Sequence, residues 1–176
     1  MGKIYEGIFI NGVFDGIMED IVDRHETLPE HILYLQPYSG RPIAELKKNP
    51  PSVELPKKIF LSTSSHLDKI IYVGQLVGWE DKQKMSVERK IEISKVIKEF
   101  QRSEKGGLYN AYNIEDLGAN VLLVRRVKKL HSPVGVENLI KVSNNEPLSS
   151  ARSRSGGYSY VNIKKGSENL FNVNYI

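Results

Sequence analysis

One stretch near the C-terminus combines residue types suited to binding phosphate and stacking on bases. It is the run from Arg152 to Tyr160, with the sequence RSRSGGYSY. Arg152 and Arg154 supply fork-shaped donors for phosphate, and the two glycines allow a backbone to approach closely. Tyr158 and Tyr160, separated by one residue, would point the same way on a strand. The pattern favours phosphate-and-base contacts, with a flexible loop before an edge strand as the alternative.

Two further features have the chemistry of a base pocket. Ser62 and Thr63 begin a run of four hydroxyl residues, which can bond phosphates or a base edge, or cap the turn that leads to His66. Trp79 is the only tryptophan. It is predicted near a strand end, where it is either a core residue or a flat partner for a flipped base.

The net charge of +4 is distributed unevenly along the chain. Residues 1–56 carry five basic and nine acidic side chains, a net charge of −4, which leaves +8 for the rest. Residues 121–176 carry nine basic side chains against three acidic ones, and Arg125, Arg126 and Lys128 are among them. Such a concentration of Lys and Arg is expected of a nucleic-acid binder, although Lys-rich surfaces are also common in other proteins.

Several classes of site are excluded by composition and spacing. There is no cysteine, which removes disulfides, thiolate metal sites and cysteine nucleophiles. The four histidines lack the spacing that places two imidazoles on one helical face. No phosphate-binding loop, dinucleotide fingerprint or nucleophile elbow is present. The sequence therefore predicts no metal, no cofactor and no catalytic residue.

The elements that would position these residues alternate between strands and helices within a single domain, residues 1–176. Glycines at 74 and 78 predict that one strand curls. We expect one α+β domain with a curved sheet and two principal helices. Strands are predicted at 4–13, 31–37, 57–62, 69–80, 120–129 and 157–163. Helices are predicted at 14–26, 41–48 and 86–101. Residues 133–140 are predicted to be extended and then to turn.

Apolar runs in this chain are far shorter than the roughly 20 residues of a membrane span. The N-terminal 15 residues also lack the order of a secretory signal peptide. The expectation is a cytoplasmic protein that makes no membrane contact.

Several segments resemble EVE domains of the PUA-like superfamily, which is structurally related to the YTH readers of N6-methyladenine. The late basic strand and the Pro-containing segment that follows it resemble the corresponding part of EVE domains. The glycine-containing strand also resembles a strand of that family. The resemblance covers roughly residues 4–163. The segments that carry it are VLLVRRVKKLHSPV at 121–134 followed by Leu139, Ile140 and Lys141, KIIYVGQLVGW at 69–79, FINGV at 9–13 and YLQPY at 34–38.

The resemblance implies a curved mixed β-barrel with flanking helices and a concave pocket for one extruded, modified base. Relatives of this kind serve as specificity modules of modification-dependent restriction systems, so the implied ligand is DNA or RNA that carries a modified base. By the resemblance, Trp79 with Tyr158 or Tyr160 would form an aromatic cage, and Ser62 and Thr63 would stand in the pocket wall. Asn11 could read a base edge through its amide. Residues expected at the nucleic-acid backbone are Arg125, Arg126, Lys128, Arg152 and Arg154.

Two rival functions stay open at the level of sequence. PUA-like relatives include small amidohydrolases that act on modified nucleosides, and Lys69, Thr63 and Glu80 could supply the required set. Alternatively, the acidic first 56 residues could contact a protein partner such as a nuclease or an AAA+ motor, which does not exclude nucleic-acid binding.

Overall fold

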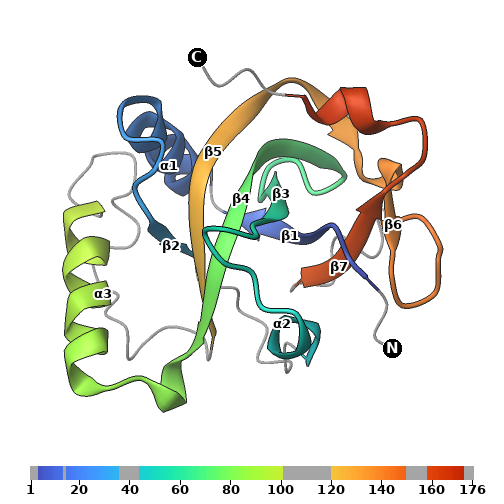
Figure 1. The fold of residues 1–176 in the computed structure, drawn as a ribbon. Coiled ribbons are helices and arrows are strands. Elements are labelled where there is room, and N and C mark those ends of the chain that lie inside the picture. The colour runs from blue at the N-terminus through green and yellow to red at the C-terminus, as the bar shows by residue number, and fades with distance from the viewer. Residues whose placement is uncertain (1–3, 14, 36–43, 101–119, 150–157, 173–176) are drawn as a thin grey trace.

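A seven-stranded mixed sheet forms the centre of the fold (Figure 1). The computed structural model describes residues 4–13, 15–35, 44–100, 120–149 and 158–172. The strands are β1 (Gly7–Val13), β2 (Leu33–Leu35), β3 (Lys57–Thr63), β4 (Lys69–Asp81), β5 (Asn120–Gly135), β6 (Leu139–Lys141) and β7 (Tyr158–Ile163), and the helices are α1 (Asp15–Thr27), α2 (Ala44–Lys48) and α3 (Val87–Phe100).

The strand order is β2-β5-β4-β3-β1-β7-β6. β1 and β3 are parallel, and the other neighbouring pairs are antiparallel. The predicted α+β class is confirmed, but the predicted barrel is wrong, because the described strands form an open order with β2 and β6 at its edges. Leu130 of β5 and Leu139 of β6 still reach one buried cluster. β5 and β6 are thus linked through buried side chains, although they are not neighbours in the described sheet.

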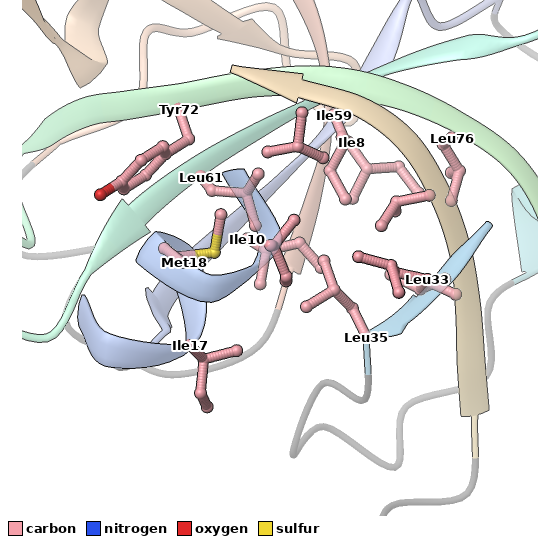
Figure 2. Close-up of a cluster of buried hydrophobic side chains, with 14 of the residues drawn as sticks. Ile8, Ile10, Ile17, Met18, Leu33, Leu35, Ile59, Leu61, Tyr72 and Leu76 are labelled. Atoms are coloured by element: carbon pink, nitrogen blue, oxygen red, sulfur yellow. The ribbon is translucent and has the colours of Figure 1, made fainter. Parts of the chain in front are cut away.

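The larger core lies between α1 and one face of the sheet (Figure 2). Met18 and Ile21 project from the buried side of α1 and are almost wholly inaccessible. They pack against alternate residues of β1 and β3, whose side chains on that face include Ile8, Ile10 and Ile59. The alternation is the ordinary two-residue period of a strand. The other face of the sheet buries a second cluster, to which Phe9, Phe60, Val73, Val161 and Phe171 belong.

Most predicted elements are found, with shifted ends. The strand predicted at 120–129 continues to Gly135 and takes in part of the segment predicted as extended. The helix predicted at 41–48 is described from Ala44 onward. None of the helices in the described ranges is long and apolar enough to cross a membrane.

The predicted curl of β4 is confirmed by a β-bulge in the β4–β5 ladder. Val73 pairs with Lys128 and Gln75 pairs with Arg125, so two residues of β5 stand opposite Gly74. Arg126, the first of the two, has φ 52°. This left-handed conformation is uncommon outside glycine, and among β-bulges it is the conformation of the first residue in the G1 type, where that residue is ordinarily glycine.

The bulge directs two consecutive backbone N–H groups of β5 toward α1 and the loop after it. The Arg126 N–H donates to the Pro29 carbonyl at 2.9 Å, and the Val127 N–H donates to Nδ1 of His25 at 3.1 Å. His25 is buried, and its Nε2 lies 2.8 Å from the His31 carbonyl. Because one nitrogen must accept and the other must donate, these bonds require the neutral Nε2–H tautomer.

We predict that Gly74→Ala destabilises the protein by about 1–3 kcal/mol, a cost typical of overpacking. A Cβ at this position would stand 2.7 Å from Val127 Cγ2 and 3.1 Å from its Cα, so the bulge would have to shift. Chemical denaturation measures the loss. The matched control is Gly78→Ala, whose Cβ meets the Leu123 side chain first at 3.2 Å and should cost less. Equal losses in the two variants would contradict the importance of the bulge.

The buried His25 makes stability depend on pH. Burial lowers the pKa of His25 from its ordinary value of 6.5. The hydrogen bond to the His31 carbonyl raises this pKa, whereas the charges of His31 and Arg24 lower it, and the net shift is downward. The unfolded chain therefore takes up a proton first as pH falls. We predict that stability is retained above about pH 6.5 and declines as pH falls from there through the lower folded pKa.

The measurement is the free energy of unfolding between about pH 7.5 and about pH 5. His25→Gln is the matched variant, because a glutamine amide can both donate and accept but does not titrate. The decline over this range should be smaller in the variant. An unchanged decline would show that other groups cause it.

Candidate nucleic-acid interface

Trp79 lies near the end of β4, half-buried against the larger core. It pairs across the ladder with Leu122 of β5. The short helix α2 packs beside it through Leu46, which is fully buried, and the exposed Lys47 places its Nζ 6.0 Å from the centroid of the indole. This distance is within the range of a cation–π contact. Trp79 therefore packs against the core and also lies near the ammonium group of an exposed lysine.

A second aromatic–lysine contact lies on the adjoining side of α2. The ring of Tyr5 is fully buried, its hydroxyl donates to the Asn49 carbonyl at 3.0 Å, and Lys57 Nζ stands 4.6 Å from its centroid. Lys57 also donates to the Tyr5 carbonyl at 2.9 Å. Burial raises the pKa of Tyr5 to about 12, and the carboxylate of Glu45 adds to the effect. Tyr5 is therefore a neutral hydrogen-bond donor at physiological pH.

Tyr160 of β7 extends this aromatic group. Its ring meets that of Tyr5 edge to face, with centroids 5.0 Å apart and an interplanar angle of 67°, a favourable arrangement for two aromatic rings. Tyr160 and Trp79 both pack against the larger core while remaining partly exposed.

These contacts belong to one place on the molecule, because Trp79 and Tyr5 are contacted by residues only two positions apart, Lys47 and Asn49. We name this group the aromatic–lysine rim; its members are Tyr5, Lys47, Lys57, Trp79 and Tyr160. Partly exposed rings beside ammonium groups can stack on bases and attract phosphates.

Ser62 and Thr63 lie at the opposite end of the β3–β4 pair from Trp79. Leu61 pairs with Tyr72, so these two residues stand near the start of β4, whereas Trp79 lies close to its end. Both are fully buried. Ser62 Oγ accepts from the Gly12 N–H at 3.1 Å, and Asn11 lies in the same irregular part of β1. The six predicted pocket residues therefore do not gather at one point.

Thr63 belongs to a polar group at the start of α1. Its hydroxyl lies 3.2 Å from Ser65 Oγ, which donates to Asp15 at 2.7 Å and lies 2.9 Å from His66 Nδ1. Partial burial raises the pKa of Asp15, but the hydrogen bonds from Ser65 and Thr63 and the nearby His66 outweigh it, so the pKa lies below its usual value. The hydroxyl run thus holds an ionised carboxylate at the N-terminus of a helix, where negative charge is favourable.

Arg125 and Arg126 meet at one carboxylate. Arg125 Nη1 donates to Glu30 Oε2 at 2.9 Å, and both Nε and Nη2 of Arg126 contact Glu30 Oε1. Lys128 follows two residues later, half-buried and paired with Val73. The two arginines predicted to contact phosphate are thus already engaged within the chain.

Three predicted contacts fall wholly or partly outside the described residues. Arg152 and Arg154 lie outside them, and Tyr158 is described only through its backbone, which pairs with Ile10.

The alternative hydrolase set is not brought together. Thr63 and Lys69 lie near the start of β4, and Glu80 lies near its end, where it binds Arg89 at 2.6 Å. The same carboxylate raises the pKa of the Arg89 guanidinium. Within the described parts of the chain, no three histidine or acidic side chains could hold a metal ion.

Sequence reasoning missed Tyr5, Lys47 and Lys57 of the rim, and it also missed Glu30 and His25. The contacts of Glu30 and His25 with β5 span 95 and 102 positions, and no local pattern signals such pairs. Lys47 had a weak signal, because it lies in a segment predicted as a short helix.

Comparison with known proteins yields one structural likeness. No protein-family model matches this chain, and no curated protein matches it. The chain is similar to a solved structure, the N-terminal domain of Staphylothermus marinus McrB, with 15% sequence identity and a TM-score of 0.42. The alignment covers 97% of this chain and 96% of that one.

We predict that Ser62→Ala destabilises the protein by about 1–3 kcal/mol, since it leaves the Gly12 N–H without its acceptor in a buried place. Ser64→Ala is the matched control, because Ser64 is exposed and should be nearly neutral. Thermal or chemical unfolding measures both. If Ser62→Ala were neutral to stability but abolished ligand binding, Ser62 would belong to a binding pocket after all.

Proposed function

We propose that this protein binds nucleic acid and reads a modified base, flipped out of its stack, at the aromatic–lysine rim. The observation that carries the proposal is the single tryptophan at the end of β4, half-buried against the core with the Lys47 ammonium beside its ring. Tyr160 supplies a second, partly exposed ring, which contacts the ring of Tyr5. The resemblance to EVE domains supports a base ligand over other flat ligands.

The rim has the physical means to hold a base. Unstacking a base costs a few kcal/mol, and stacking on an aromatic side chain returns about 1–3 kcal/mol. Lys47 is exposed and joined to the protein by a flexible stem. Its ammonium can therefore leave the indole and pair with a phosphate while the base occupies the ring.

Phosphate contacts would supply the remaining affinity. The basic C-terminal third of the chain, net +6 over residues 121–176, attracts the backbone without regard to sequence. Arg152 and Arg154 are proposed members of this surface, together with Lys128. A restriction system that recognises modified nucleic acid, with a nuclease or AAA+ motor as partner, is the proposed setting, and both DNA and RNA suit the rim.

The test is fluorescence anisotropy with single- and double-stranded oligonucleotides of DNA and RNA, unmodified or with one methylated or hydroxymethylated base. We predict tighter binding to at least one modified oligonucleotide than to its unmodified match. Affinity should fall steeply with added salt, by a slope that counts the phosphates neutralised. Absence of binding to every oligonucleotide at low salt would contradict the proposal.

We predict that Trp79→Ala removes the preference for the modified base, with a loss of about 1–3 kcal/mol in binding it. Trp79→Phe should retain part of the preference, because phenylalanine keeps an aromatic face. Lys95→Ala, an exposed lysine of α3, is the control for a change of surface. If folded Trp79→Ala kept its preference for the modified base, the base would be bound at another site.

A further inference from the structure

We propose that Arg125 and Arg126 form a second phosphate-binding site, which the carboxylate of Glu30 keeps closed until a nucleic-acid phosphate displaces it. The inference rests on the proposed function and deepens it, because it adds a self-blocked backbone contact to the base site. Its ligand class is a phosphodiester group, or another anion with several oxygens.

The geometry is that of an anion site with an internal occupant. Arg125 donates through Nη1 to one Glu30 oxygen, and Arg126 contacts the other oxygen through Nε and Nη2. A phosphodiester likewise presents two unbridged oxygens to arginine forks. Because one carboxylate faces two guanidiniums, these three groups retain a net charge of +1.

Arg125 is fixed in place independently of Glu30. Its Nε donates to Gln75 Oε1 at 2.9 Å, and its Nη2 donates to the Val53 carbonyl at 3.2 Å. Only 12% of its side chain is exposed, against 53% for Glu30. The cation is therefore held by the fold, whereas the carboxylate can swing into water without disturbing the core.

The bulge in β5 makes this convergence possible. Consecutive residues of a regular strand point to opposite faces, so Arg125 and Arg126 would ordinarily diverge. The left-handed conformation of Arg126, at φ 52°, turns the chain so that both guanidiniums reach Glu30. A left-handed backbone conformation at a non-glycine residue is frequent at ligand-binding sites.

An internal competitor has a defined effect on selectivity. Glu30 is tethered three residues after the end of α1 at Thr27, and its loop is bound to the bulge through the Pro29 carbonyl. Its effective concentration at the arginines therefore exceeds that of a dilute free anion. Only a phosphate delivered by a ligand that is already bound elsewhere, such as at the aromatic–lysine rim, would compete well.

The first experiment compares Glu30→Gln with Glu26→Gln. Both variants lose one negative charge from the same region, but Glu26 is an exposed residue of α1 and serves as the matched control for long-range electrostatics. We expect Glu30→Gln to bind oligonucleotides several-fold more tightly than the wild-type protein at low salt, because no carboxylate has to leave the two arginines before a phosphate binds them. Equal behaviour of the two variants would overturn the proposal.

A second variant assigns the gain to the arginines. Adding Arg126→Gln to Glu30→Gln should return the affinity toward that of the wild-type protein and lower the salt slope by about 0.9 for a phosphate contact that is lost. If the gain survived this second substitution, the anion would be bound elsewhere, and the proposal would fail.

An arm without nucleic acid separates this site from the proposed function. Inorganic tripolyphosphate, titrated by calorimetry, should bind Glu30→Gln and bind Glu26→Gln much more weakly. Binding of this anion without any oligonucleotide binding would support the arginine site and contradict the base-reading function. Oligonucleotide binding with no difference between the two variants would contradict the arginine site and leave the base-reading function supported.

A measurement on the wild-type chain covers the case in which Glu30→Gln fails to fold. The Nε–H signals of Arg125 and Arg126 can be followed by NMR during titration with tripolyphosphate at high concentration. Both signals should shift as Glu30 is displaced. Unchanged signals at saturating anion would contradict the site.

Discussion

The backbone bulge at Arg126 and Val127 is the constraint on which the rest of this structure depends. Gly74 leaves the space for it, because any Cβ there would meet Val127. The bulge frees two N–H groups, and a buried neutral His25 and the Pro29 carbonyl accept them. These two bonds attach α1 and the loop after it to β5, and α1 in turn covers the larger core. The same bulge brings Arg125 and Arg126 to Glu30.

The charged groups and the aromatic groups therefore have different origins in the fold. The arginines are placed by an irregular backbone, whereas the aromatic–lysine rim is placed by ordinary packing, in which the buried Leu46 anchors α2 beside Trp79. The rim has flat rings and ammonium groups, and the arginine pair has fork-shaped donors, which are groups that can stack on bases and bind phosphates.

Local patterns predicted the elements well, and distant contacts explain what they missed. The helical spacing of Ile17, Met18 and Ile21 and the glycines of β4 are local signals, and both α1 and the curled strand are present. The prediction of a closed barrel was wrong, because closure depends on which strand edges pair. The residue pattern of a single strand does not indicate its neighbours. Ser62 looked like a pocket residue from its type alone, yet its hydroxyl accepts a backbone bond from a residue 50 positions away.

The most direct test of the account is the intrinsic fluorescence of Trp79 during titration with an oligonucleotide that carries a modified base. Since this is the only tryptophan, its emission reports on one place in the molecule. Stacking of a base on the indole should quench the emission in step with binding, and an unmodified oligonucleotide should quench it less. Full binding of the modified oligonucleotide with unchanged emission would contradict the account, because the base would then be held away from the rim.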